Sequence, residues 1–153
     1  MAKTLAAREN AILLVLDDLL AELYPGEVID IALFVEYSNR ISRAMVPHIC
    51  TMVSKGMTVV LDFPGNTRRQ RAWFTRLIEL SGADHELHYI DVSDEVCKQQ
   101  LAKRSQSLPE GSAWTTEAEF EAITAHFDPP ADEEGFNVIH HRQGGLGLDV
   151  DSI

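Results

Sequence analysis

Aspartates follow three apolar stretches of the sequence, at the positions where strands would end. Asp17 (with Asp18) follows AILLVL, Asp62 follows MTVVL, and Asp91 closes HELHYID. A carboxylate in such a place can hold Mg²⁺ or accept a proton from a substrate hydroxyl. It can equally cap the helix that follows. Because Asp17 and Asp62 end separate strands before turn residues, we interpret them as catalytic candidates. We interpret Asp91 as structural, since Ser93 caps the next helix.

Basic residues gather in three segments, although the chain has 13 Lys and Arg against 24 Asp and Glu and a net charge of −11. The three groups are Arg40 and Arg43; Arg68, Arg69 and Arg71; and Lys103 and Arg104. Arginine and lysine are the usual partners of phosphate groups. Any one group is explained by a solvated helix face. Together with the strand-end acids, they indicate a site for phosphate groups and a metal ion.

Composition argues against several other classes of protein. The 153 residues fit one domain, and 45% hydrophobic and 24% charged residues are ordinary for a globular chain. The negative charge opposes binding to nucleic acid or anionic lipid. No apolar run is long enough for a membrane span and no secretory leader opens the chain, so we expect a cytoplasmic protein. Cys50 and Cys97 are expected to be buried reduced thiols. No GxSxG or HExxH motif supports nucleophilic or zinc chemistry.

The acids and bases are positioned by strands that alternate with helices. Apolar blocks predict strands over 11–16, 57–61, 85–91 and 136–140. Helical patterns cover 3–10, 17–23, 29–55, 67–80, 93–104 and 116–126, with Pro47 expected to kink or divide the third. Such alternation predicts a three-layer α/β domain over residues 1–142 with a mainly parallel sheet. Residues 143–153 are expected to form a flexible tail. Ligands of such sheets bind beyond the carboxyl ends of the strands.

Five segments resemble a family of bacterial P-loop ATP-binding proteins. They are LVLDDLLAELYPGEV, YSNRISRAMVPH, GMTVVLDFPGNTRRQRAWF, ADHELHYIDVSDEVCKQQLAKR and FEAITAHFDPPADEEGFNVIHH. The family comprises AAA-type ATPases or predicted kinases and is similar to the zeta-toxin, gluconate-kinase and chloramphenicol-phosphotransferase group. The likeness covers nearly the whole chain, and the LDFPxNT…R segment and the F-x-PP-x-x-x-EGF ending are its most specific parts.

The resemblance implies transfer of the γ-phosphoryl of ATP, with Mg²⁺, to a small hydroxylated acceptor. Asp17 would orient or deprotonate the acceptor hydroxyl, and Asp62 would support Mg²⁺ or the acceptor. Four residues would line the acceptor side: Arg40, Arg43, Thr67 and Arg71. Lys103 and Arg104 would face the phosphates at the start of a lid over about 104–116.

One departure from the family pattern concerns the phosphate-binding loop. The family begins with a strand followed by G-x-x-x-x-G-K-[ST], whose amides and lysine hold phosphates. The 153 residues contain no such motif. Aligning LAAR (5–8) with the end of the family's first helix places that lysine about two residues before Met1. Val15 and Leu16 also replace the family's Ser-Glu before Asp17.

The missing first strand is normally central, so its absence leaves an unpaired slot in the sheet. One interpretation is that Met1 is an internal methionine of a longer protein. The other is that this form closes the gap by rearrangement or as a homodimer. We therefore expect either a small-molecule kinase impaired in this form, or a non-catalytic remnant that acts as a binding or regulatory partner.

Overall fold

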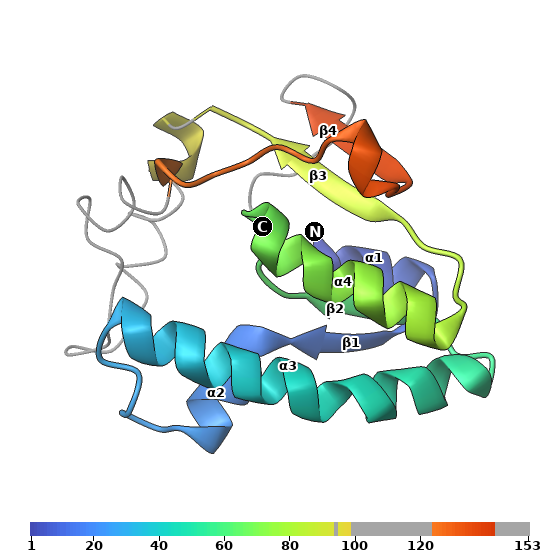
Figure 1. The fold of residues 1–153 in the computed structure, drawn as a ribbon, viewed down its shortest axis with the longest axis horizontal. Coiled ribbons are helices and arrows are strands. Elements are labelled where there is room, and N and C mark those ends of the chain that lie inside the picture. The colour runs from blue at the N-terminus through green and yellow to red at the C-terminus, as the bar shows by residue number, and fades with distance from the viewer. Residues whose placement is uncertain (94, 99–123, 143–153) are drawn as a thin grey trace.

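The computed structural model describes residues 1–93, 95–98 and 124–142 and shows a mixed α/β arrangement (Figure 1). Its elements in chain order are α1 (Ala2–Arg8), β1 (Ile12–Val15), α2 (Leu16–Leu23), α3 (Ile31–Ser54), β2 (Val59–Asp62), α4 (Arg68–Ser81), β3 (Leu87–Asp91), the 3-10 helix η1 (Asp132–Glu134) and β4 (Val138–Arg142). All four predicted strands are present. The two helices expected over 93–104 and 116–126, the lid and the tail lie wholly or largely outside the described residues.

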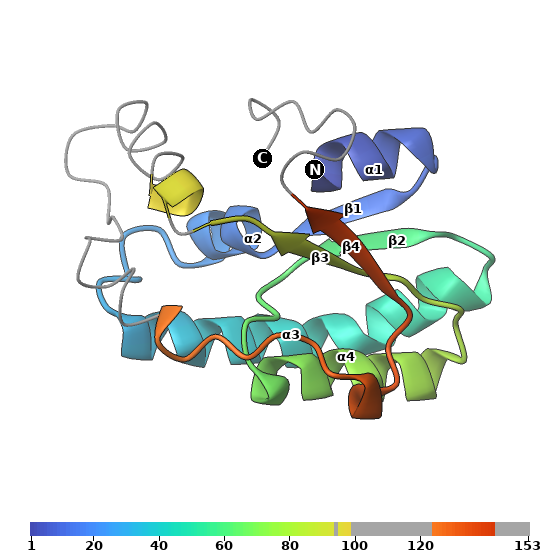
Figure 2. The same cartoon turned by 90° about the horizontal axis from the view of Figure 1, so that it is seen from above.

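The strands form two parallel pairs rather than one sheet. β1 pairs with β2, and β3 pairs with β4. All four strands run in the same direction, with β2 and β3 as the inner strands (Figure 1). Helix α1 lies on one side of the strands, and α3 and α4 lie on the other (Figure 2). No ladder joins β2 to β3 among the described residues.

The first strand is shorter than the sequence predicted. The apolar block 11–16 forms a strand only over Ile12–Val15, and Leu16 already begins α2. Leu16 is 1% exposed and packs with Leu20 and Ile41 in the core between α2 and α3. Leu16, the last apolar residue of the block, is therefore apolar because it packs in this core and not because it belongs to the strand. As a result, Asp17 lies in a helix rather than at the end of a strand.

Pro47 was expected to kink or divide this helix, and the structure shows that it does not divide it, because α3 is continuous from Ile31 to Ser54. Proline removes one N–H from the ladder of the helix. The turn that follows is supported by the Thr51 hydroxyl, which donates to the Pro47 carbonyl at 2.8 Å. Asp30 caps the helix by accepting from the Leu33 amide at 2.8 Å. Ile41 and Ile49 on one face of the helix are buried, and this packing holds the helix together across the proline.

Helix α4 begins and ends at local signals that the sequence carries. Thr67 precedes it as the N-cap residue, and Gly82 ends it in the left-handed conformation at φ 64°. Glycine adopts positive φ without the steric penalty that a β-carbon brings. Between these ends the helix buries Leu77 and Arg71. A fully buried arginine within the helix is the feature of this element that hydrophobic patterning did not predict.

Candidate functional site

The two candidate catalytic aspartates lie at one edge of a parallel pair of strands. Val15 of β1 is opposite Asp62, the last residue of β2. Asp17 follows Val15 by two residues, in the first turn of α2, where a helix favours negative charge. Both carboxylates are exposed. The structure thus brings Asp17 and Asp62 to the same carboxyl edge, where ligands of parallel sheets bind.

Thr67 is held at the start of α4 by a capping box. Its hydroxyl oxygen accepts from the Gln70 amide at 3.2 Å, and the Gln70 side chain accepts from the Thr67 amide at 3.1 Å. These bonds satisfy donors that a helix start would otherwise leave unpaired. Capping is therefore the role that the structure assigns to Thr67. Its contact with an acceptor stays a prediction.

Arg71 has all five of its N–H donors bonded inside the protein, and it is 0% exposed. Nε and Nη2 donate to the two carboxylate oxygens of Glu134 at 2.8 and 2.7 Å. Nη1 donates to the carbonyls of Gly65 and Asp128 at 2.9 and 2.6 Å, and Nη2 also donates to that of Pro129 at 3.3 Å. An acceptor could reach this guanidinium only if the cluster opened. Arg71 as an acceptor residue stays a prediction.

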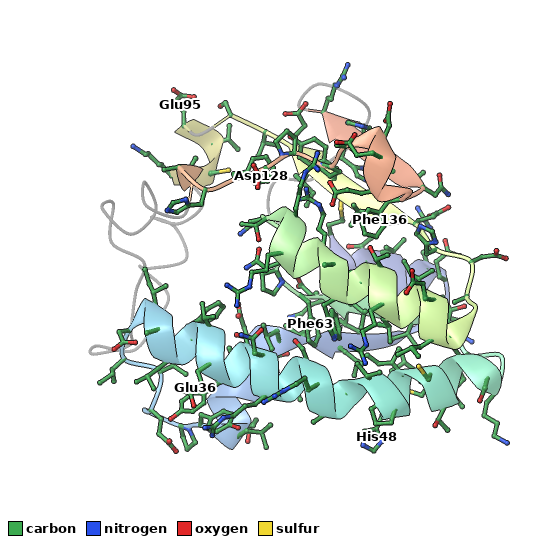
Figure 3. The ribbon with its side chains drawn as sticks, in the orientation of Figure 1. Glu36, His48, Phe63, Glu95, Asp128 and Phe136 are labelled. Carbon is green, nitrogen blue, oxygen red and sulfur yellow. The ribbon has the colours of Figure 1, made fainter. Side chains whose placement is uncertain are left out.

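The segment 128–134 is fixed to α4 and to the loop after β2 by this cluster. The Asp128 amide donates to the Asn66 carbonyl at 2.8 Å, and Arg68 pairs with Glu133 on the surface. Figure 3 shows Asp128 beside the amino end of α4, and Phe63 between α3 and α4. The hydrogen bond from Arg71 holds the pKa of Glu134 below its ordinary value, against the opposing effect of burial.

Sequence reasoning missed the Arg71–Glu134 pair because its partners are 63 residues apart. A weak signal was present in the sequence. Two arginines three residues apart on α4, Arg68 and Arg71, face two consecutive glutamates, Glu133 and Glu134. Two arginines and two glutamates can form two ion pairs. Such groups of opposite charge are common on helix surfaces, so they do not identify a particular pair.

Arg40 and Arg43 lie on α3. Arg40 pairs with Glu36, and its guanidinium carbon lies 5.5 Å from the ring centroid of Tyr37. Arg43 is exposed. Among the described residues, neither arginine forms an ion pair with Asp62 or with the other strand-end acids of the site. The structure places these predicted acceptor residues on the same helix without joining them to the carboxylates.

A stack of two tyrosines joins α3 to the chain after α2. The rings of Tyr24 and Tyr37 are parallel, with centroids 4.0 Å apart. The Tyr37 hydroxyl donates to Glu27 at 3.1 Å. Partial desolvation and this hydrogen bond raise the pKa of Tyr37. The stack fixes the first half of α3, and therefore Arg40, relative to α2 and Asp17.

The second pair of strands carries its own acid and base at the carboxyl edge. Asp91 of β3 is opposite Arg142 of β4, and their side chains lie 3.8 Å apart. Both groups are exposed, so this pair adds little stability. The structural role expected for Asp91 is compatible with this contact, although the pairing itself was not predicted.

The carboxylates at the carboxyl edge of β1 and β2 fit Mg²⁺ only if a bound nucleotide supplies further ligands. Within the described ranges, no three His, Cys, Asp or Glu side chains are grouped closely enough to hold a metal ion. Mg²⁺ bound with nucleotides is commonly held by one or two carboxylates together with phosphates and water. Asp62, exposed at the end of β2, meets that requirement as a single ligand. Lys103 and Arg104, the predicted phosphate-facing residues, lie outside the described residues.

The comparison with protein families identifies the family of this chain. Residues 1–130 match the model of an AAA domain family. The chain belongs to this family, which makes it a P-loop kinase-like protein of the nucleotide-binding class. No curated protein and no solved structure matches the chain. In the part of the chain that the structure describes, no helix has the length and apolar character needed to cross a membrane.

Proposed function

We propose that this chain is the larger part of a small-molecule kinase domain that transfers the γ-phosphoryl group of ATP to a hydroxylated acceptor. The observation that carries the proposal is the register of β1 and β2, which brings Asp17 and Asp62 to one carboxyl edge. Family membership over residues 1–130 supports nucleotide binding. The acceptor itself is defined only by chemistry, as a small molecule with a hydroxyl group.

In this proposal each carboxylate has a separate task. Asp17 orients the acceptor hydroxyl and takes its proton as the oxygen attacks the γ-phosphorus of ATP, and the bond from that phosphorus to the β-phosphate oxygen breaks and releases ADP. Asp62 supports Mg²⁺ when ATP is bound, and the metal supplies neutralisation of charge on the phosphates. Arg40 and Arg43 bind anionic groups of the acceptor. Lys103 and Arg104 bind the phosphates from the lid over 104–116.

The phosphate-holding half of the site is the part that the 153 residues do not supply. No G-x-x-x-x-G-K-[ST] motif occurs among them. The three-layer fold that we propose lacks the family's first strand, and the separation of the four strands into two pairs supports this. Because phosphate contacts are the main electrostatic element of such sites, the 153-residue chain should bind ATP poorly.

The alternative proposal is that the chain is a non-catalytic binding or regulatory module. The two functions are distinguished by the DNA upstream of Met1. An in-frame strand followed by G-x-x-x-x-G-K-[ST] supports the kinase, whereas stop codons immediately upstream support the module. For the 153-residue chain, calorimetry with Mg-ATP should show no binding at micromolar concentrations, and a clear isotherm would contradict the proposed gap.

For a chain extended by that motif, Asp17→Asn should abolish phosphoryl transfer to acceptors in a metabolite screen, while ATP affinity changes little. The carboxylate acts on the acceptor hydroxyl, so nucleotide binding does not depend on it. Arg76→Gln, on the exposed face of α4, is a control that should keep both properties. Loss of ATP binding in Asp17→Asn would contradict the role given to this residue.

A further inference from the structure

The segment over residues 18–37, which we call the α2–α3 lobe, exposes a large share of the apolar surface. Seven large apolar residues are exposed in the part of the chain that the structure describes, and four of them lie in this lobe. They are Leu23, Ile29, Ile31 and Val35, with exposed fractions of 58, 75, 46 and 42%. Single exposed apolar residues are normal on protein surfaces, whereas a group of neighbouring ones marks an interaction site.

The lobe already contains the apolar residues that its own packing needs. Several of its partly buried side chains pack against the core cluster around Leu16. They are Leu19, Tyr24, Val28, Phe34 and Tyr37. Leu23, Ile29 and Val35 each adjoin one of these inward residues in the sequence and are themselves exposed. A second set of apolar side chains is therefore left over once the core has been filled.

The exposed apolar residues belong to one small region, at the end of the molecule where α3 begins (Figures 1 and 2). Ile31 and Val35 are one turn apart on α3, so their side chains share a face of the helix. The ring stack of Tyr24 on Tyr37, with centroids 4.0 Å apart, ties the end of α2 to the same helix. The connection between the two helices, which carries Ile29, is thereby held next to the first turns of α3.

The same lobe is strongly acidic. Five carboxylates lie between residues 18 and 37, and this stretch contains no Lys, Arg or His. They are Asp18, Glu22, Glu27, Asp30 and Glu36, all of them exposed. Apolar and polar side chains side by side are the usual components of a protein interface. The negative charge of this one selects a cationic partner.

Charge also decides between the possible occupants of this surface. A second copy of the chain, related by a two-fold axis, would place the five carboxylates of one lobe against the five of the other. Anionic lipid and nucleic acid would be repelled in the same way. The lobe consists of helices and the turn that connects them, so it offers no strand edge to an extended peptide. A helix with apolar side chains on one face and Lys or Arg beside them satisfies both the apolar and the charged groups.

We infer that the α2–α3 lobe is a docking surface for a basic amphipathic helix of a partner protein. Apolar side chains of that helix cover the four exposed apolar residues, and its Lys or Arg residues meet the surrounding carboxylates. The inference holds for a kinase and for a binding module alike, because none of the four apolar residues has a task in the proposed phosphoryl transfer.

The test uses the full chain and the peptide acetyl-KLKKLLKKLLKKLK-amide, whose pattern is that of a basic amphipathic helix, as a probe. Calorimetry should give a micromolar dissociation constant that rises with salt, because charges contribute to the binding. NMR spectra should show shifted amide signals within residues 22–36 and unchanged signals for α4. A peptide of the same composition in scrambled order keeps the charge but loses the apolar face, so it should bind at least about tenfold more weakly.

Two pairs of variants separate docking on the lobe from general attraction to an acidic protein. Ile29→Ser should weaken binding of the probe about tenfold, whereas Leu80→Ser, at an exposed position of α4, should have no effect. Glu22→Lys should weaken binding at least about threefold more than Glu79→Lys, which changes the net charge equally but lies on α4. All four side chains are exposed, so thermal unfolding should show that each variant keeps its fold.

Equal effects of the lobe variants and the α4 variants would overturn the inference, because binding would then depend on net charge alone. Absence of binding would overturn it as well. Sedimentation of the free chain and vesicles of phosphatidylglycerol test the other occupants. A dimer that Ile29→Ser dissociates would assign the surface to a second copy of the chain. Vesicle binding that the same variant abolishes would assign it to a membrane, and either result would contradict the proposed partner.

Discussion

Arg71 and Glu134 form a two-pronged ion pair, with Nε–Oε2 and Nη2–Oε1 distances of 2.8 and 2.7 Å and an arginine that is 0% exposed. The pair connects α4 to the segment that leads into β4, on the far side of the strands from α1. Since three backbone carbonyls share the same guanidinium, Arg71 organises the chain around the loop that follows β2. Through its bond to the Gly65 carbonyl, Arg71 therefore helps to fix the loop that follows Asp62 at the carboxyl edge.

Replacing Arg71 by methionine should lower the free energy of unfolding by about 3–5 kcal/mol, the usual effect of removing one partner from a buried ion pair. The Glu134 carboxylate and the carbonyls of Gly65, Asp128 and Pro129 would lose their donors together. Urea denaturation of wild type and variant measures the change. Arg68→Met is the matched control on the same helix, and it should have a much smaller effect because the Arg68–Glu133 pair is exposed. Equal effects of the two substitutions would show that burial of Arg71 does not matter.

Stability should decrease in acid partly through Glu134. In the folded protein the hydrogen bond from Arg71 lowers the pKa of this carboxyl below 4.5. The unfolded state then binds the proton more readily, so the stabilisation is complete above about pH 4.5 and is lost as the pH falls through the folded value. Urea titrations between pH 3 and 6 should show a smaller acid-dependent loss in Glu134→Gln than in wild type. Identical pH dependence of the two proteins would contradict the assignment.

Thr67 offers a test of capping against acceptor binding. Thr67→Ala should destabilise the protein by about 1 kcal/mol, because the Gln70 amide loses its side-chain acceptor. Thr67→Ser keeps the hydroxyl and should stay close to wild type in thermal and urea unfolding. A variant that loses no stability on Thr67→Ala would show that the capping box is not the main role of this residue.

The parts of the fold that follow from local pattern were predicted well. The apolar blocks before Asp62 and Asp91 became β2 and β3, and the helix predicted over 67–80 became α4. The presence of both Asp17 and Asp62 at one edge also followed, because parallel strands share their carboxyl ends. The predicted ends of strands were less accurate where an apolar residue could belong either to the strand or to the helix that follows it. Leu16 is the example, because it was assigned to the strand and lies in α2.

Contacts between residues far apart in the sequence could not be predicted from the hydrophobic periodicity of single elements. The position of Arg71 on an amphipathic helix says nothing about whether its charge meets solvent, a ligand or a buried glutamate 63 residues away. The continuity of α3 through Pro47 has the same origin, since packing of Ile41 and Ile49 compensates for a local penalty. The pairing of His88 with His141 likewise depends on the register of β3 and β4, which the predicted strands over 85–91 and 136–140 do not specify.

The histidine pair on the second sheet should make stability depend on pH near neutrality. Nδ1 of His88 and Nε2 of His141 are 2.9 Å apart, so one nitrogen donates to the other while at most one ring is charged. Burial, the neighbouring His88 and Arg8 lower the pKa of His141 below 6.5. Because the unfolded chain takes up this proton more readily, stability should be greatest above pH 6.5 and should decline as the pH falls through the folded value.

Replacing His141 by glutamine tests this linkage, because glutamine can still hydrogen-bond to His88 but does not titrate. The free energy of unfolding of His141→Gln should change less between pH 5 and pH 7 than that of wild type. An NMR titration of the His141 ring protons should give a midpoint below 6.5. A midpoint above 6.5 would reverse the sign of the linkage: protonation would then stabilise the fold, and the contact between the rings would have to be a charged hydrogen bond at neutral pH.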